Sequence, residues 1–128
     1  MQTTDPTRVF IVDDSASVRA RLVRMLDPLD GVKLVGEAGT AREAIEAIDC
    51  LVPHSVLLDL NLPDASGVEV MRTLRPRWPA MVFVVLTNHP EPQYRRACER
   101  AGAAYFFDKS NEFHRVPEVV RRIASTRQ

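Results

Sequence analysis

The stretch VFIVDDSASVRARL, residues 9–22, joins a short apolar run to a helical pattern through two adjacent aspartates. Val9 to Val12 include no polar residue, which is typical of a strand covered on both faces of a sheet. Asp13 and Asp14 follow at once, although adjacent carboxylates repel each other and a partly buried pair costs more. The stretch therefore predicts a strand and a helix with a costly pair of acids between them.

Similar apolar runs recur along the chain and alternate with segments of helical spacing. The runs are residues 9–12, 32–38, 55–60, 81–86 and 104–107. After the second run, Thr40 begins a capping box, because Glu43 follows three residues later. Five alternations of strand and helix predict an α/β fold, a doubly wound (βα)5 sandwich with a five-stranded parallel sheet and helices on both faces.

Prolines and glycines set the expected limits of the later helices. A third helix runs from Gly67 to Leu74 and is stopped by the prolines that follow. Pro90 opens the fourth helix and Gly102 ends it. Pro117 fits only in the first turn of the last helix.

The length and composition favour one domain that needs no disulfide or metal cross-links. A chain of 128 residues fits a single domain, which we place at residues 8–124 between flexible tails at 1–7 and 125–128. Lys plus Arg (17) balance Asp plus Glu (17), so no global charge attracts nucleic acid or membrane. The longest apolar run is too short to span a bilayer, and the N-terminus has no apolar stretch of a signal peptide.

The two cysteines favour a cytoplasmic location. Cys50 and Cys98 lie far apart in the chain and form no paired motif. We expect reduced thiols with a role in packing, with a disulfide between them as the minor alternative.

Polar residues stand at the expected carboxyl ends of the strands, where ligands bind in open α/β sheets. They are Asp13 and Asp14 after the first strand, Asp59 after the third, Thr87 after the fourth and Lys109 after the fifth. Three close carboxylates suit Mg²⁺, which takes oxygen ligands and keeps positions open for phosphate oxygens. A hydroxyl and an ammonium can hold a phosphoryl group while an aspartate attacks phosphorus. The pattern predicts phosphoryl transfer to Asp59.

Four motifs in order resemble the response regulator receiver domain, the CheY-like fold. They are DD at 13–14, LLDLNLPDASG at 57–67, LTN at 86–88 and GAAYFFDKS at 102–110. The resemblance covers about residues 8–124. It implies the sheet order 2-1-3-4-5 and transfer of a phosphoryl group from a sensor histidine kinase, or a phosphotransfer protein, to the domain.

The resemblance also assigns the acceptor and the metal ligands. Asp59 would be the phosphoacceptor and a ligand of Mg²⁺. Asp14 would bind the metal directly, Asp13 mainly through water, and Asn61 through its backbone carbonyl.

The remaining roles concern the bound phosphoryl group and the switch. Thr87 would bond the phosphoryl group and Lys109 would pair with it. Phe106 stands where the family usually has a switch aromatic, often Tyr, whereas Tyr105 would point to the opposite side. The family usually has Lys-Pro where this chain has Lys109-Ser110, and we expect a trans bond there.

The resemblance further implies how the signal leaves the domain. We expect an output protein or a second copy to dock on the face formed by the fourth helix, the fifth strand and the last helix. The domain would be a monomer before phosphorylation and dimerise after it, without binding nucleic acid or membrane itself. It would be no enzyme beyond the making and breaking of its own acyl phosphate.

Three alternatives have weaker support. A haloacid-dehalogenase-type phosphatase needs a second acid two residues after the nucleophile, where this chain has Asn61, which cannot shuttle a proton. A flavodoxin-like cofactor binder needs a phosphate-cradling loop, but DDSAS at 13–17 is acidic. The segment LVGEAGTAREAIEA at 34–47 is similar to receivers of LuxR-type transcription factors. Because the chain ends at residue 128, we favour a stand-alone regulator over the receiver portion of such a factor.

Overall fold

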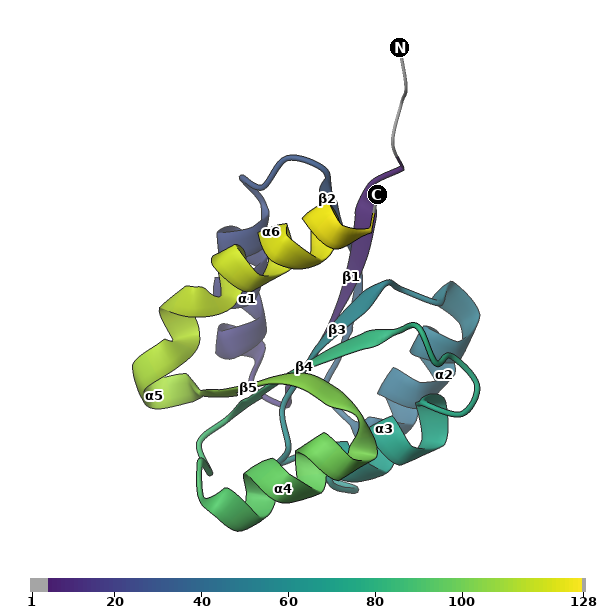
Figure 1. Ribbon diagram of the computed structural model, residues 1–128, viewed down its shortest axis with the longest axis vertical. Helices are drawn as coiled ribbons and strands as arrows, with labels where there is room; N and C mark the ends of the chain where they lie inside the picture. The colour runs from purple at the N-terminus through teal and green to yellow at the C-terminus, as the bar shows by residue number, and fades with distance from the viewer. Residues whose placement is uncertain (1–4, 128) are drawn as a thin grey trace.

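A five-stranded parallel sheet forms the centre of the protein in a computed structural model that describes residues 5–127 (Figure 1). Its strands are β1 (Thr7–Val12), β2 (Val32–Ala38), β3 (Ser55–Leu58), β4 (Val82–Thr87) and β5 (Ala103–Asp108). All four neighbouring pairs are parallel, and the strand order is β2-β1-β3-β4-β5. The fold class and the order 2-1-3-4-5 are confirmed.

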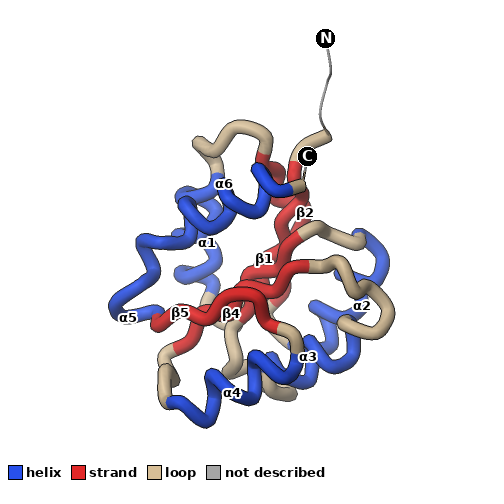
Figure 2. Tube along the Cα trace, viewed as in Figure 1, coloured by secondary structure: helices blue, strands red, loops and turns tan. Residues whose placement is uncertain are grey.

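Helices cover both faces of this sheet (Figure 2). The long ones are α1 (Ala16–Leu26), α2 (Ala41–Leu51), α3 (Gly67–Leu74), α4 (Pro92–Ala101) and α6 (Val116–Thr126). Helices α1 and α6 lie on one side of the sheet and α2, α3 and α4 on the other, as Figure 1 shows. Among the residues that the structure describes, none of the helices has the length and apolarity that a bilayer crossing needs.

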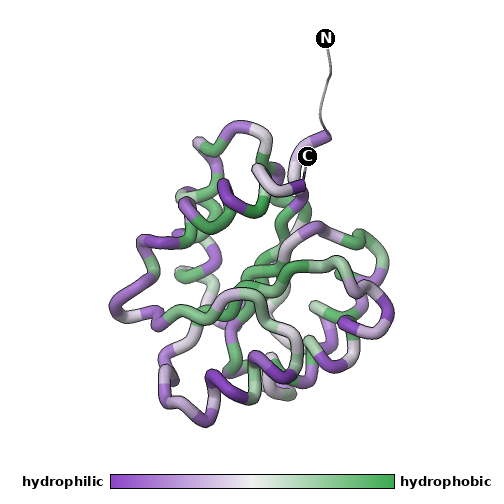
Figure 3. Tube along the Cα trace, viewed as in Figure 1, coloured by the Kyte–Doolittle hydropathy of each residue, from purple (hydrophilic) through white to green (hydrophobic). Residues whose placement is uncertain are grey.

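Alternate strand residues feed two separate cores, which is why the strands are apolar without interruption. Val9 and Ile11 pack with the core under α1 and α6, whereas Phe10 and Val12 pack with the core under α2, α3 and α4. Figure 3 shows the apolar strands at the centre and the polar helix surfaces outside.

Local signals account for the ends of several helices. The Thr40 hydroxyl accepts a hydrogen bond from the Glu43 N–H at 3.1 Å, which confirms the predicted capping box of α2. Gly102 ends α4 with φ +105°, a left-handed conformation that suits glycine. Pro117 lies in the first turn of α6, as predicted.

Other limits differ from the sequence prediction. Helix α4 begins at Pro92 and not at Pro90, with Glu91 as its N-cap residue. A short helix α5 (Lys109–Glu112) and a 3₁₀ turn η1 (Phe113–Arg115) precede α6, and neither was predicted. Their signal is local, because the Asp108 carboxylate accepts from the Ser110 N–H and so starts α5.

The two ends of the described chain are tied to each other. Arg127 donates to the Thr7 hydroxyl at 3.0 Å and to the carbonyls of Asp5 and Pro6. Thr7 is already the first residue of β1 and Thr126 is the last residue of α6, although we placed residues 1–7 and 125–128 in the tails. Residues 1–4 and 128 of the predicted tails lie outside the described residues, and the flexibility of the tails stays a prediction.

The cysteines are both free thiols, as expected. Cys50 is exposed on α2 and Cys98 is buried on α4. Burial raises the pKa of the Cys98 thiol to about 11, so it stays protonated and serves as a core residue.

Candidate functional site: an acidic cluster at the carboxyl edge of the sheet

Three aspartates meet where β1 and β3 end. Asp13 and Asp14 follow β1, and Asp59 follows β3, the neighbouring strand. One carboxylate oxygen from each lies within 4.8 Å of the others. Asp13 is 2 % exposed and Asp59 is 5 % exposed, whereas Asp14 is exposed. The cluster therefore combines two buried acids with one that water reaches.

Lys109 provides the positive charge inside the cluster. Its ammonium lies 2.5 Å from Asp13 Oδ2 and 3.2 Å from Asp59 Oδ2. Lys109 is the first residue of α5 and directly follows β5. A third strand, beside β1 and β3, therefore brings a residue to the site. In this state, the lysine is paired more closely with Asp13 than with the predicted acceptor.

Burial and charge shift the two central groups. Burial raises the pKa of the Asp59 carboxyl, the Lys109 charge lowers it, and the net shift is upward. Burial alone would lower the pKa of Lys109, but the hydrogen bond to Asp13 and the charge of Asp59 outweigh it and the net shift is upward. Perturbed groups of this kind mark candidate functional sites.

Backbone groups fix the aspartates in place. Asp13 Oδ1 accepts the Ser15 N–H at 2.9 Å, and Asp59 Oδ1 accepts the Asn61 N–H at 3.3 Å. Ser15 is also the N-cap of α1. Arg19 donates to the Asp13 carbonyl at 2.5 Å, which holds the end of β1 against α1.

Gly67 lets helix α3 approach Asp59 closely. A Cβ at this position would lie 2.5 Å from the Asp59 carbonyl oxygen, closer than real Cβ atoms come to backbone. The Gly67 N–H also donates to the Leu60 carbonyl at 2.8 Å. Glycine here therefore sets the distance between α3 and the backbone of Asp59 and Leu60, a role that we did not predict.

A cavity of about 510 Å³ opens beside these acids. Its lining includes all three aspartates, Lys109, Asn61 and Asn88. Of the predicted site residues, five thus share one cavity: Asp13, Asp14, Asp59, Asn61 and Lys109. This space can hold a small hydrated ion and a phosphoryl group.

Thr87 does not line this cavity, but the next residue in the chain, Asn88, does. It is the last residue of β4, its side chain is completely buried, and its hydroxyl oxygen accepts the His89 N–H at 3.0 Å. The hydroxyl proton can still be donated, because the oxygen acts only as an acceptor in that bond. Binding of a phosphoryl group by Thr87 stays a prediction.

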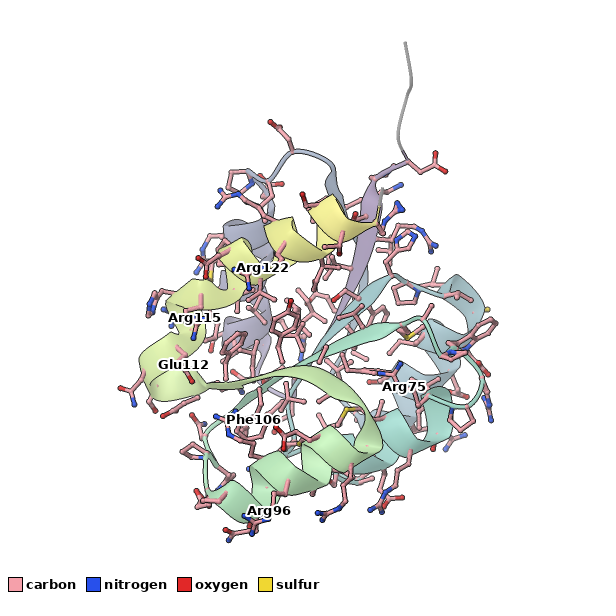
Figure 4. All side chains as sticks on the ribbon, viewed as in Figure 1. Arg75, Arg96, Phe106, Glu112, Arg115 and Arg122 are labelled. Carbon is pink, nitrogen blue, oxygen red and sulfur yellow. The ribbon has the colours of Figure 1, made fainter. Side chains whose placement is uncertain are left out.

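Phe106 belongs to the core between the sheet and α4, as Figure 4 shows. Arg96, on the same helix α4, points away from the sheet in this view. The Phe106 ring is 6 % exposed, and the Arg95 guanidinium lies 4.6 Å above it. Tyr105 packs on the opposite side of the sheet, where it stacks on Phe107, as expected. Arg95 is a contact that sequence spacing alone did not reveal.

The Lys109–Ser110 bond is trans, as we expected. The bond lies in the first turn of α5, and Glu112 on this helix accepts the Asp108 N–H at 3.0 Å. Figure 4 shows Glu112 and Arg115 on this segment, where they form an ion pair of 3.1 Å. The loop after β5 is therefore fixed by side chains where the family usually has proline.

A family model described as the response regulator receiver domain matches residues 9–121. The chain belongs to this family. Receiver domains are signalling domains of two-component systems. They take phosphoryl groups from histidine kinases and bind Mg²⁺ at an acidic pocket, and the aspartate cluster of this receiver could hold such an ion.

Curated relatives of this receiver are longer proteins. The chain is 31 % identical over 116 residues to the response regulator GacA of Pseudomonas protegens, covering 91 % of this chain and 54 % of that protein. It is 31 % identical over 120 residues to the DNA-binding transcriptional activator DevR/DosR of Mycobacterium tuberculosis, covering 94 % and 55 %. The chain thus spans about half the length of these relatives.

A solved structure agrees with the fold. The signal receiver domain of the putative response regulator NarL from Mycobacterium tuberculosis is 28 % identical and superposes with a TM-score of 0.87, covering 95 % of this chain and 98 % of that one. The family and the CheY-like fold that the sequence motifs suggested are confirmed.

Proposed function

We propose that this receiver accepts a phosphoryl group on Asp59 from a sensor histidine kinase or a phosphotransfer protein in the cytoplasm. The observation that supports this proposal is that three carboxylates and one largely buried lysine meet at the carboxyl edge of the sheet. Charges that are costly to bury have a use where a metal ion and a phosphoryl group can both bind.

The donor set suits Mg²⁺. Asp14 is exposed and can bind an ion directly, whereas both Asp13 oxygens already accept bonds, from Ser15 and Lys109, which favours contact through water. The Asn61 carbonyl and Asp59 would complete the protein ligands. When bound, the ion supplies positive charge and fixed positions for phosphoryl oxygens.

The transfer step would use the residues as follows. A carboxylate oxygen of Asp59 attacks phosphorus, the new O–P bond forms, and the P–N bond to the kinase imidazole breaks with its electron pair left on nitrogen. Lys109 pairs with the transferred group, and the Thr87 hydroxyl donates to one of its oxygens. In-line transfer needs mainly such positioning and charge neutralisation.

The signal would leave through the face formed by α4, β5 and α6. Thr87 and Lys109 contact the phosphoryl group, and Phe106 lies three residues from Lys109. Two discrete packings of the Phe106 ring would couple the site to this face, because packed cores switch between arrangements and do not deform continuously. An output protein or a second copy would dock there, so that a monomer dimerises after phosphorylation.

The acceptor is tested by intact mass after incubation with acetyl phosphate or phosphoramidate and Mg²⁺. We expect one phosphoryl adduct in the wild type and in Asp30→Asn, a control at an exposed aspartate, and none in Asp59→Asn or with EDTA. An adduct that persists in Asp59→Asn would refute the acceptor, and labelling that ignores EDTA would refute the metal site.

The output face is tested by amide exchange with and without beryllofluoride, a stable mimic of the acyl phosphate. Protection changes should cluster in residues 86–110 and in α6. Arg95→Gln should alter the response, because Arg95 covers the Phe106 ring, whereas its neighbour Arg96→Gln should not. Changes confined to α2 and α3, or an unchanged response in Phe106→Ala, would contradict this coupling.

Enzymatic turnover of external phosphate esters is one alternative. Asn61 follows Asp59 by two residues and cannot act as a general acid or base. We expect less than one turnover of p-nitrophenyl phosphate per chain, with hydrolysis of the domain's own acyl phosphate as its only reaction. Many turnovers per chain would favour a phosphatase.

A second candidate role is that of the receiver portion of a LuxR-type transcription factor. The length of the relatives favours it, since DevR/DosR is named as DNA-binding and this chain covers 55 % of it. Sequencing of the complete transcript would decide, because a DNA-binding domain encoded after residue 128 supports this role and a stop codon there contradicts it.

A further inference from the structure

A second cavity of about 480 Å³ lies at the amino edge of the sheet, opposite the acidic cluster. Segments that are far apart in the sequence surround it. They are the start of β1, the turn between α2 and β3, the segment between α3 and β4, and the end of α6. Figure 1 shows the end of α6 beside the start of β1. The size falls in the range of small-molecule pockets.

The wall of this cavity is mostly apolar. Trp78, Met81, Val52 and Ile123 contribute to it. The Trp78 indole N–H donates to Asp49 Oδ1 at 2.9 Å, so the polar atom of the ring is satisfied and the ring face remains apolar. An apolar wall with few polar groups is the usual composition of a ligand site.

Apart from the Thr126 hydroxyl, the polar side chains of the lining are basic. They are Arg8, Arg127 and His54, and within residues 5–127 no carboxylate residue belongs to the lining. Arg8 donates to the Leu51 carbonyl at 2.6 Å, and Arg127 donates to a hydroxyl and two carbonyls. These neutral partners hold both guanidinium groups without cancelling their charge, and each group keeps N–H donors to spare.

The pKa of His54 is sensitive to the charges that surround this cavity. Its Nδ1 accepts the Arg8 backbone N–H at 2.9 Å. Burial lowers the pKa of His54, and the charges of Arg127 and Arg8 lower it further, against a smaller opposite effect of Asp5. The cavity is therefore a region of positive potential with an apolar wall.

We propose that this cavity binds a small organic carboxylate with an apolar body. The body would lie against Trp78 and Met81, and the carboxylate would accept hydrogen bonds from Arg8 and Arg127. Guanidinium and carboxylate groups form strong, charge-assisted hydrogen bonds, which gives the site its preference for an anion. The proposal does not depend on phosphorylation of Asp59.

Three ligands that share a phenylpropyl group and differ in the charge of their end group distinguish the contribution of charge from that of apolar contact. We would titrate the chain with 3-phenylpropionate, 3-phenylpropanamide and 3-phenylpropylamine, and follow the fluorescence of Trp78, the one tryptophan of the sequence. The carboxylate should bind about tenfold more tightly than the amide, and the amine should bind most weakly. Octanoate, with an aliphatic body, should also bind.

Variants locate the binding site. Arg8→Gln and Arg127→Gln should each weaken carboxylate binding by about tenfold, whereas Arg24→Gln, at an exposed arginine of α1, should leave it unchanged. Ala80→Phe should abolish binding because the added ring fills the space that Ala80 now lines, and it leaves Trp78 as the one tryptophan. Asp59→Asn should bind like the wild type, which keeps this test separate from that of the acceptor.

Nuclear magnetic resonance provides a second measurement. A bound carboxylate should raise the pKa of His54, because its negative charge opposes the effect of the two arginines. Equal affinity for all three phenyl ligands, or a His54 pKa that does not change at saturation, would overturn the proposal. The proposal would also be overturned if neither 3-phenylpropionate nor octanoate showed saturable binding up to about 10 mM. A formed pocket of this size should bind such ligands more tightly than that.

Discussion

The two edges of the sheet gather charged groups in opposite ways. At the carboxyl edge, Asp13, Asp59 and Lys109 are almost completely buried and depend on one another for charge balance. At the amino edge, Arg8 and Arg127 bind neutral carbonyl and hydroxyl groups and keep their net charge. Buried charge can therefore lower stability at the carboxyl edge, because its acids repel one another whenever the lysine or a metal ion is missing, whereas the arginines at the amino edge have neutral partners.

The largest effect should follow from removal of the central cation. Lys109→Met leaves two buried carboxylates without a compensating positive charge, so the free energy of unfolding should fall by about 3 kcal/mol, as for a broken buried ion pair. Urea denaturation measures this loss. Lys33→Met, at an exposed lysine of β2, should change stability by less than about 0.5 kcal/mol. Equal effects of the two substitutions would mean that the carboxyl edge does not rely on its lysine.

Two glycines, one at each edge, should differ in the stability that an added Cβ costs. Gly67→Ala places a Cβ against the Asp59 carbonyl oxygen, and the shift it forces should cost about 2 kcal/mol. Gly31→Ala adds a Cβ in open space, with only the left-handed backbone at φ +73° to penalise it, so about 1 kcal/mol is expected.

The same urea experiment decides between the two glycine costs. Gly67→Ala should also slow phosphorylation by acetyl phosphate, because it displaces the backbone that holds Asp59. Gly31→Ala should phosphorylate at the wild-type rate. A Gly67→Ala variant that is as stable and as reactive as the wild type would show that α3 does not set the position of Asp59.

The sequence predicted the fold because its signals are local. Uninterrupted apolar runs identify strands buried on both faces, and Thr40, Gly102 and Pro117 mark helix limits through backbone chemistry. The acidic cluster was also predictable, since carboxyl ends of parallel strands meet at one edge. The pairing of Lys109 with Asp13 was not, because distances within such a cluster depend on the final packing.

Contacts between distant segments were not visible in the sequence. Arg95 above Phe106 links residues on α4 and β5, and the cavity at the amino edge brings Arg8 together with Trp78 and Arg127. No spacing rule relates such positions until the strand order and the helix faces are known. The short helix α5 was missed because four residues are too few for a periodic pattern.

A smaller, stabilising effect should follow from neutralisation of Asp59. Burial raises the pKa of Asp59, so the charged carboxylate is less favourable in the folded state than in the unfolded chain. Asp59→Asn should therefore increase the free energy of unfolding at pH 7 by about 1 kcal/mol in the absence of metal.

The pH dependence of this gain follows from the sign of the shift. A group whose folded pKa is raised loses stability as pH rises through that pKa, so the advantage of Asp59→Asn should grow with pH from the acid side and then level off. Asp64→Asn is the matched opposite case. Hydrogen bonds from the Ala41 and Arg42 N–H groups lower the pKa of Asp64, so its contribution should be lost as pH falls. Two variants with the same pH trend would contradict this assignment.

The smallest effect is expected at the amino edge, from His54. Burial and the charges of Arg127 and Arg8 lower its pKa, so between that lowered value and about 6.5 the unfolded chain binds more protons than the folded one. Stability should therefore fall as pH drops below about 6.5, by no more than about 0.5 kcal/mol, because solvent screens a partly exposed ring. His54→Gln should remove this fall, whereas His114→Gln, at an exposed histidine of η1, should retain it. Chemical denaturation at pH 5, 6 and 7 measures the difference. Parallel profiles of the wild type and His54→Gln would mean that the arginines at this edge are screened from the ring, and that the positive potential of the cavity is weaker than its lining suggests.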